Sequence, residues 1–343
     1  MRKRVRQLAG LTRKVSTGDR SERELLGRIR SRFEELGAEE RVDFFHWLSD
    51  DFEVGLENID ELMSQVRTTR VEDRLAWNTA VRDLRKAIAS PRQRLLEGLI
   101  NTPGGMEFVF ELRAEVLDAQ RNGETGLEAL EEDIAHLLNR WCQHGLLYLE
   151  EIHLGSPFET IRFLKNREMV HPMVGLEEMG QRLGEDRMCF ALNHVAMPKD
   201  PVVFIEVALS RGLVHSIHEI IDDREGASLS TKTPDAAIFY SINNTQNGLA
   251  GLGLGKVLIF RVTEALKERH PTLKTFATLS PIPGFWPRYL KPILTGDDDR
   301  FKVKLNDLLK KFPDTTRQAV TKRYTEEGGD AGDFAGVLLG VLT

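Results

Sequence analysis

Apolar residues recur every three or four positions along most of the first 142 residues, as they do on one face of an α-helix. The stretch RVDFFHWLSDDF, at residues 41–52, is a clear example. Clusters of β-branched residues and hairpin dipeptides are rare in this half. The pattern therefore predicts an all-α helical bundle over residues 1–150, with Trp77 and Trp141 in its core and no visible chemistry.

Two helix starts are indicated by their capping residues. Thr102 followed by Pro103 is typical of an N-cap and a first helical position. Ser156-Pro157-Phe158-Glu159 has the spacing of a capping box, with proline at the first helical position. We expect the second of these helices to continue to about Arg167.

The pattern changes near Gly145, where apolar runs of strand length appear. A helix pattern from about Lys256 to Arg269 follows them, and then a strand that ends at Ser280. This half, residues 151–343, is therefore expected to be a second domain, of the α/β or α+β class, with a mixed sheet. The strand-length runs are 146–154, 187–195, 201–210 and 236–243.

The last part of the chain has a weaker pattern. A loop is expected at 296–299, an amphipathic helix at 301–312 and a further helix at 315–324. The tail, 328–343, is rich in glycine and apolar residues and ends without a polar finish. We expect from this that the second domain is C-terminally incomplete.

Composition narrows the class of protein. The 343 residues are 41% hydrophobic and 29% charged, as in ordinary globular proteins, and the net charge of −6 argues against nucleic acid as a partner. The two cysteines exclude a disulfide scaffold and fit a reducing compartment. No apolar run could span a bilayer, so no membrane partner is expected.

The N-terminus is basic and contains no acid from Met1 to Thr17. A basic first helix turn or arm in a cytoplasmic protein is the expectation we favour. A mitochondrial presequence, and with it the mitochondrial matrix, is the alternative.

A glycine-rich turn precedes the helix that begins near Lys256. A helix N-terminus with glycines before it can bind phosphate through its unpaired N–H groups. The intervals do not fit a Rossmann fingerprint, and Lys256 is followed by Val257, which does not fit a Walker A loop. The acyl-CoA N-acyltransferase (GNAT) turn Q/R-x-x-G-x-G/A, which binds the CoA pyrophosphate, remains. The candidate residues are Ala250, Gly251, Leu252, Gly253, Leu254, Gly255 and Lys256.

Ser280 and His194 each stand at the end of a predicted strand. No G-x-S-x-G elbow surrounds Ser280, so a hydrolase nucleophile is not indicated, and a serine before proline is often a turn residue. His194 could line a cleft or be a satisfied loop histidine. His215 and His218 have no third ligand at the usual spacing, so no metal site is expected.

Several ordered blocks of the sequence together resemble the malonyl-CoA decarboxylase family. The combination of the glycine turn with LSPIPGF is far more specific than either alone, and the resemblance covers nearly the whole chain. The blocks are MVHPM around His171, CFALNHVAMPKDPVVFIEVALS from Cys189, AIFYSINNTQNGLAGLGLGKVLI from Ala237 and FATLSPIPGFWPRYL from Phe276.

The resemblance implies a GNAT-like catalytic domain that converts malonyl-CoA to acetyl-CoA and CO2. It implies no metal or organic cofactor, because CoA enters as part of the substrate. By position, Ser280 is the catalytic serine that hydrogen-bonds the malonyl group, and Ala250 to Lys256 form the CoA-binding turn. The helical half fits the family's N-terminal domain, and we expect it to form a homo-oligomer.

One departure from the family matters for activity. The family's second catalytic residue is a histidine well beyond the serine, and no histidine follows His270 here. We therefore expect little decarboxylase activity unless another histidine, of which His194 is our candidate, substitutes. A GNAT-type acyltransferase and a non-catalytic acyl-CoA-binding or interaction protein stay open as alternatives.

Overall fold

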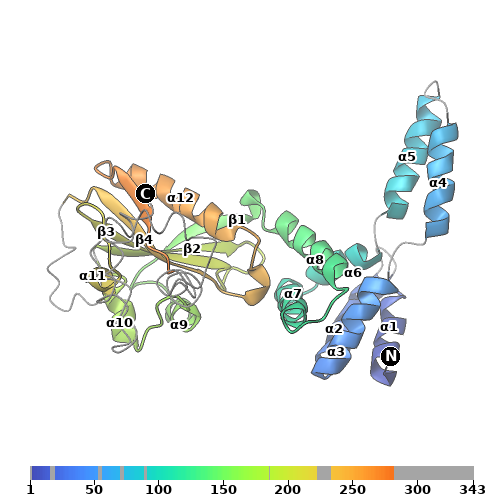
Figure 1. Cartoon of the computed structure of the whole chain (residues 1–343), viewed down its shortest axis with the longest axis horizontal. Coiled ribbons are helices and arrows are strands. Elements are labelled where there is room, and N and C mark those ends of the chain that lie inside the picture. Colours follow the sequence, from blue (N-terminus) through green and yellow to red (C-terminus); the bar gives the residue numbers. More distant parts are fainter. Residues whose placement is uncertain are drawn as a thin grey trace, which may run out of the picture. The chain divides into compact units, whose positions relative to one another are not determined.

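The computed structural model describes residues 2–15, 20–52, 56–69, 73–88, 91–184, 186–221 and 233–281 (Figure 1). The loop and helices expected between 296 and 324, and the apolar tail, lie outside these residues. The chain divides into two compact units. A helical unit comprises Met1–Tyr148, Leu192–Val202 and Asn244–Leu254, and a sheet unit comprises Leu149–Ala191, Val203–Asn243 and Gly255–Thr343. The proposed domain boundary at residue 150 stays a prediction.

The helical unit confirms the helix pattern of the first half. Its centre is apolar and aromatic, because the ring of Phe33 contacts those of Phe44, Phe45 and Phe108 at centroid distances of 5.5 to 5.9 Å. The helices are α1 Lys3–Thr12, α2 Arg20–Glu34, α3 Ala38–Asp50, α4 Leu56–Thr68, α5 Arg74–Ile88, α6 Pro91–Ile100, α7 Gly105–Arg121 and α8 Glu128–Trp141.

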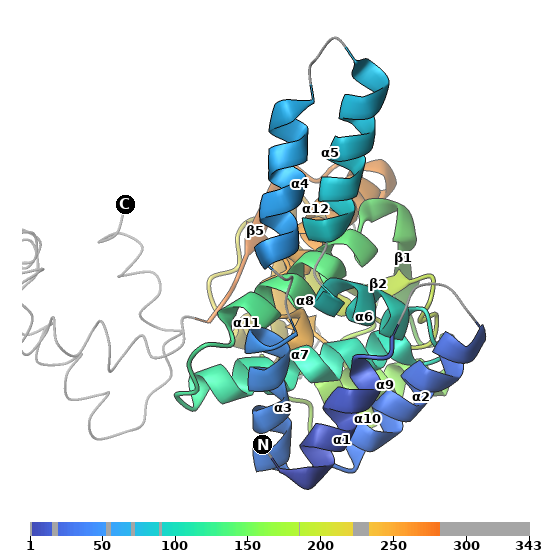
Figure 2. The ribbon, with the colours of Figure 1, turned by 90° about the vertical axis from the view of Figure 1, so that its right-hand side faces the viewer.

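The hairpin of α4 and α5 differs from the expected bundle. The two helices lie side by side and extend away from the other helices of their unit (Figure 2). Trp77 was expected in the core, but it is 37% exposed, and Leu75 beside it is 79% exposed. The expectation for Trp77 is therefore wrong, because among the described residues α5 packs mainly on α4 and buries Ala80 but not Trp77.

Both predicted caps are also wrong. The Thr102 hydroxyl donates to the carbonyl oxygen of Leu99 at 2.6 Å, and α7 begins after Gly104, which adopts a left-handed φ of 65°. The Ser156 hydroxyl accepts a hydrogen bond from the backbone N–H of His153 at 3.1 Å, so it does not cap α9, Phe158–Arg167. In both places the hydroxyl turns back to the preceding segment, a competition that short polar side chains often enter.

The second half contains a five-stranded sheet with the order β1-β2-β3-β4-β5. β4 and β5 pair in parallel, with Ala236 opposite Thr275 and Phe239 opposite Thr278. The α+β expectation is thus confirmed. The strands are β1 Leu147–Ile152, β2 Arg187–His194, β3 Val203–Ser210, β4 Ala236–Asn244 and β5 Thr275–Thr278.

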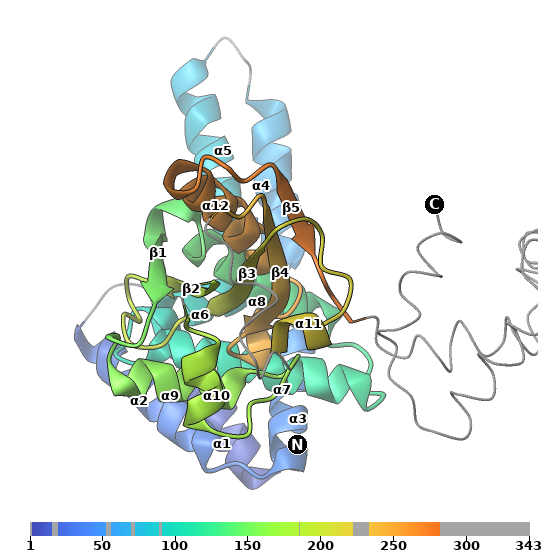
Figure 3. The same cartoon turned by 90° about the vertical axis from the view of Figure 1, so that its left-hand side faces the viewer.

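Helices cover both faces of this sheet (Figures 1 and 3). The helix α12, Leu254–Arg269, lies on one face, and α9, α10 (Leu176–Gln181) and α11 (His218–Ile221) lie on the other. β2 and β3 are buried almost throughout, since both of their faces are covered. The face of α9 and α10 buries Leu164 and Met179 against Phe204, and α11 buries Ile220 against Ile238.

Candidate active site

The glycine turn begins with a short 3-10 helix, Asn247–Leu249, and leads directly into α12. Gly251 and Gly253 have φ values of 78° and 73°, which residues with a Cβ rarely adopt. The helix begins at Leu254, two residues earlier than the sequence indicated, because Leu254 is buried in the same row as Leu258.

The backbone of this turn contains N–H groups that could donate hydrogen bonds to a ligand. Across the described ranges, the N–H groups of Gly251 and Gly253 make no hydrogen bond. The first N–H groups of α12 also lack intrahelical partners, as at any helix N-terminus. Lys256 is exposed in this first turn, which contains no acidic residue. These are the features that favour an anion such as a pyrophosphate.

The other end of the turn is fixed within the helical unit by α7. Gly248 lies so close to this helix that an added Cβ would approach the carbonyl oxygen of Phe110 to 1.9 Å. Arg113, which is 4% exposed, donates hydrogen bonds to the carbonyl oxygens of Gly248 and Ala250 at 2.6 and 2.7 Å. Neither contact was predicted, since the helical half was expected to carry no chemistry.

Ser280 lies two residues beyond β5 and is exposed. The N–H of Leu279 donates to the carbonyl oxygen of Phe239 at 2.8 Å, so the pairing with β4 continues to this point. Ala277 and Leu279 pack against the α11 face of the sheet. Because strand side chains alternate, Ser280 is on the α12 face, the face covered by the helix that follows the glycine turn.

A buried polar network joins β4 to the loop that follows α9. The carboxylate of Glu168, 3% exposed, accepts hydrogen bonds from Ser241 Oγ and Asn243 Nδ2, both at 2.7 Å. Its other oxygen accepts from the N–H groups of Val170 and His171 at 2.8 and 2.7 Å. The network fixes the loop of MVHPM against β4.

The loop that carries Glu168 contacts two neighbouring positions of β4. Tyr240 packs in the cluster with α11 and its ring lies 6.5 Å from that of His171, while Ser241 contacts Glu168. A ring contact as well as hydrogen bonds therefore holds this loop to the strand.

A second group of polar residues beside β3 and β4 comprises Arg182, Glu206, Tyr240 and His171. Arg182 Nη1 donates to Glu206 Oε2 at 3.1 Å, and both residues are nearly fully buried. Burial, followed by the nearby carboxylate of Glu168, raises the pKa of Glu206 to about 7. Within the part of the chain described, His171 Nε2 has no hydrogen-bond partner, and the Tyr240 hydroxyl lies beside Glu206.

His194, the candidate replacement for the family's histidine, is fully buried at the end of β2. Its Nδ1 accepts from the N–H of Ala196 at 3.0 Å, and its Nε2, which therefore carries the hydrogen, lies 2.9 Å from the carbonyl oxygen of Trp141. Burial lowers the pKa of His194. Both nitrogens are engaged, which favours the satisfied structural histidine over a proton-transfer role.

The two units divide the candidate residues between them. Gly255, Lys256 and Ser280 belong to the sheet unit, whereas Ala250 to Leu254 and His194 belong to the helical unit.

Other kinds of functional feature would be a metal site, a membrane-spanning helix or a reactive thiol. Among the described residues no three His, Cys, Asp or Glu side chains group as metal ligands, and no described helix is long and apolar enough to cross a membrane. Burial raises the pKa of Cys142 to about 11 and that of Cys189 well above its usual range, so both thiols are neutral.

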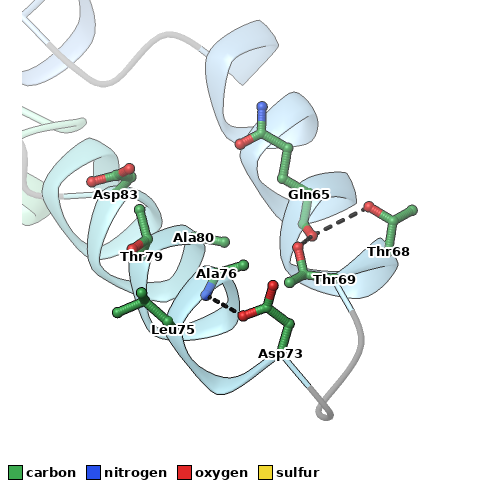
Figure 4. Close-up of a pocket in the computed structure, with 9 residues that line it drawn as sticks. All are labelled: Gln65, Thr68, Thr69, Asp73, Leu75, Ala76, Thr79, Ala80 and Asp83. Atoms are coloured by element: carbon green, nitrogen blue, oxygen red, sulfur yellow. Dashed lines mark hydrogen bonds between the residues drawn. The ribbon is translucent and has the colours of Figure 1, made fainter.

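A separate pocket of about 480 Å³ lies between α4 and α5 (Figure 4). Its two charged lining residues are Asp73 and Asp83. Asp73 is engaged in capping α5, since its Oδ1 accepts from the N–H of Ala76 at 3.0 Å. The lining offers no base beside a nucleophile, and we assign no function to it.

Together, the helical unit and the five-stranded sheet with its covering helices define an α+β protein. Comparison with known families identifies it further. The malonyl-CoA decarboxylase N-terminal domain matches residues 52–142, and the malonyl-CoA decarboxylase C-terminal domain matches residues 145–323. The chain belongs to the malonyl-CoA decarboxylase family.

Individual relatives agree with this assignment. The chain is 31% identical over 292 residues to the mitochondrial malonyl-CoA decarboxylase of Anser anser anser, covering 82% of this chain and 56% of that one. It is 35% identical over 206 residues to that of Rattus norvegicus, covering 59% and 42%. The chain thus spans about half the length of the curated relatives it matches.

Solved structures of the family have the same fold. The malonyl-CoA decarboxylase of Agrobacterium vitis superposes with a TM-score of 0.75 at 32% identity, covering 94% of this chain and 78% of that one. That of Rhodopseudomonas palustris superposes with a TM-score of 0.74 at 28% identity, covering 89% and 74%.

Proposed function

We propose that this chain decarboxylates malonyl-CoA to acetyl-CoA and CO2. The observation that carries the proposal is the match of both family domains, in order, over residues 52–142 and 145–323. Two features of the site agree with it. The turn before α12 has N–H groups that make no hydrogen bond within the described part of the chain and are suited to the CoA pyrophosphate, and Ser280 is on the same face of the sheet as α12.

The reaction defines what the site must do. The bond from C2 to the carboxylate carbon breaks, its electron pair enters the thioester as an enolate, CO2 leaves, and a proton is added at C2. The Ser280 hydroxyl would donate a hydrogen bond to the malonyl group, which is most useful where negative charge develops. Gly251, Gly253, the start of α12 and Lys256 would hold the pyrophosphate.

The group that would donate the proton to C2 is the least well supported part of the proposed site. Among the described residues, our candidate for this donor is His194, and both of its nitrogens are engaged in hydrogen bonds. General acid catalysis typically contributes about 10²- to 10⁴-fold. We therefore expect turnover that is slow by that factor but above the rate in buffer.

Product analysis separates this function from its alternatives. Purified chain is incubated with malonyl-CoA labelled in the free carboxylate, with and without an amine acceptor. Equal amounts of CO2 and acetyl-CoA, independent of the amine, support decarboxylation. Acyl-amine would instead indicate an acyltransferase, and binding without any product would indicate a non-catalytic acyl-CoA-binding protein; either result overturns the proposal.

We also propose that the helical unit mediates a homo-oligomer. The apolar side chains of Leu75 and Ile88 on α5 are 79% and 53% exposed, a pattern common where another chain packs. Light scattering should give a mass above one chain, and Leu75→Glu with Ile88→Glu should reduce it to the monomer. The matched change Leu154→Glu, on a 65% exposed residue outside the helices, should not. A monomeric wild type would contradict the proposal.

The compartment is likewise a proposal. The basic N-terminal segment forms α1, whose Val5 and Leu8 are buried, so this segment is part of the folded helical unit. We propose that the chain is cytoplasmic and that residues 1–12 are not a presequence, although the names of the curated relatives place those proteins in mitochondria. Imaging of the tagged chain, with a matched form lacking Met1–Thr12, tests it: identical cytoplasmic distributions support the proposal, and mitochondrial targeting that is lost with the segment contradicts it.

A further inference from the structure

Within the helical unit, Arg113 connects α7 to the glycine turn through a guanidinium whose three nitrogens all donate hydrogen bonds. It lies on α7 and is 4% exposed. Its Nε and Nη2 donate to Glu131 Oε1 of α8 at 3.0 and 2.6 Å. Its Nη1 donates to the carbonyl oxygens of Gly248 and Ala250, 135 and 137 residues away in sequence. Burial of a cation costs free energy unless its N–H groups are hydrogen-bonded. Arg113 therefore holds Glu131 and the turn carbonyls in place.

The contact with Ala250 determines the direction of the next N–H. The peptide between Ala250 and Gly251 is trans and planar, so its C=O and N–H point in opposite directions. With the carbonyl oxygen 2.7 Å from Arg113 Nη1, the N–H of Gly251 points away from Arg113. That N–H is one of the donors without a hydrogen bond among the described residues.

The close contact of Gly248 with α7 also fixes the distance between the turn and this helix. An added Cβ on Gly248 would lie 1.9 Å from the carbonyl oxygen of Phe110, so the turn rests directly on the helix backbone. The left-handed φ of Gly251 then carries the chain into α12. The turn therefore has one backbone orientation, which α7 and α8 impose.

We propose that Arg113 is a positioning residue for CoA binding, because it fixes the direction in which the turn presents the Gly251 N–H to the pyrophosphate. The inference rests on the proposed function, in which this turn binds CoA. Arg113 itself does not touch the ligand. It acts through the Ala250–Gly251 peptide, and Glu131 orients it.

The chain contains a matched control for this role. Arg92 on α6 is also 4% exposed, pairs with Asp133 of α8 at 2.6 Å, and donates to the carbonyl oxygens of Leu48 and Ser49 at 2.7 and 2.9 Å. It thus has the same burial and the same kinds of partner as Arg113, but it holds helix α3 and no part of the turn. A purely structural role predicts the same consequences for both arginines.

The test compares Arg113→Lys with Arg92→Lys in the full chain. Lysine keeps the charge but lacks the planar fork needed to reach a carboxylate and two carbonyls together. Calorimetric titration gives Kd for CoA, at a temperature where melting curves show each variant folded. We expect Arg113→Lys to weaken CoA binding roughly tenfold, in line with the loss of charge-assisted hydrogen bonds, and Arg92→Lys by less than about twofold. In turnover of malonyl-CoA, Arg113→Lys should raise KM and leave kcat unchanged.

A second pair of variants covers the case in which a lysine variant does not fold. Glu131→Gln and Asp133→Asn loosen the same two arginines without removing them, and only Glu131→Gln should weaken CoA binding. Equal losses of CoA affinity within either pair, with wild type binding normally, would overturn the positioning role alone. Wild type that does not bind CoA would instead overturn the proposed function, and the positioning role with it.

Discussion

Ser241 Oγ donates a 2.7 Å hydrogen bond to the buried carboxylate of Glu168, two residues after Phe239, which is paired with Thr278 of β5. The same carboxylate accepts from the Asn243 side chain and from two backbone N–H groups of the loop at 170–171. All of these partners are donors. Only an ionised carboxylate, which has no donor of its own, satisfies them together.

Replacement of Glu168 by glutamine should therefore destabilise the sheet unit. The amide NH2 of glutamine would face a donor, leaving buried groups unpaired, at a cost of about 3 kcal/mol. Urea denaturation of Glu168→Gln and wild type measures this. The control is Glu159→Gln, whose side chain is 75% exposed and pairs with Arg162 on the surface; it should change stability by less than about 0.5 kcal/mol. Equal effects of the two substitutions would contradict the role of the network.

The unfolding free energy should also depend on Glu206. Burial raises the pKa of Glu206 from 4.5 to about 7, so the folded state holds a proton that the unfolded state releases. The stabilisation is present at low pH and is lost as the pH rises through the range between these two values. Between pH 5 and pH 7.5 the unfolding free energy of wild type should fall, relative to Glu206→Gln, by about 2 kcal/mol. A constant difference over this range would show that the Arg182 pair keeps Glu206 ionised.

Gly251→Ala should weaken CoA binding beyond its effect on stability. Alanine at the φ of 78° costs about 1–2 kcal/mol, although no atom lies within 4 Å of the added Cβ. Gly212→Ala is the matched control, since its φ is 80° and its surroundings are equally open, but it lies in the loop after β3. Both variants should lose similar stability in urea, and only Gly251→Ala should raise Kd for CoA several-fold. Comparable values of Kd for the two would remove the turn from the binding site.

Sequence pattern predicted the parts of this fold that depend on local periodicity. The strand runs and the helix before Arg269 were found because apolar spacing of two or of three to four residues is a property of neighbouring positions. The caps at Thr102 and Ser156 were wrong because a hydroxyl can bond backward as readily as forward. The prediction that Trp77 lies in the core was wrong because spacing indicates an apolar face but not whether another element covers it.

The candidate site was predictable only in its local parts. Glycines before a helix can be seen in sequence, and the left-handed values at Gly251 and Gly253 agree with them. The contacts of Arg113 with Gly248 join positions 135 residues apart, and those of Glu168 with Ser241 join positions 73 apart. No spacing rule links such residues, since only the tertiary fold brings them together. The sequence did show an arginine, Arg113, among the apolar residues of α7, which could have indicated a buried polar contact.

The central claim is tested most directly by CO2 release from malonyl-CoA labelled in the free carboxylate, measured for wild type, Ser280→Ala and Thr278→Ala. Thr278 is the matched control, being an exposed hydroxyl two residues earlier on the same face of β5. We predict acetyl-CoA and CO2 in equal amounts from wild type and from Thr278→Ala. For Ser280→Ala we predict a rate roughly 100-fold lower, or the buffer rate, with CoA binding retained. Release by Ser280→Ala at the wild-type rate, or none by wild type, would contradict the account.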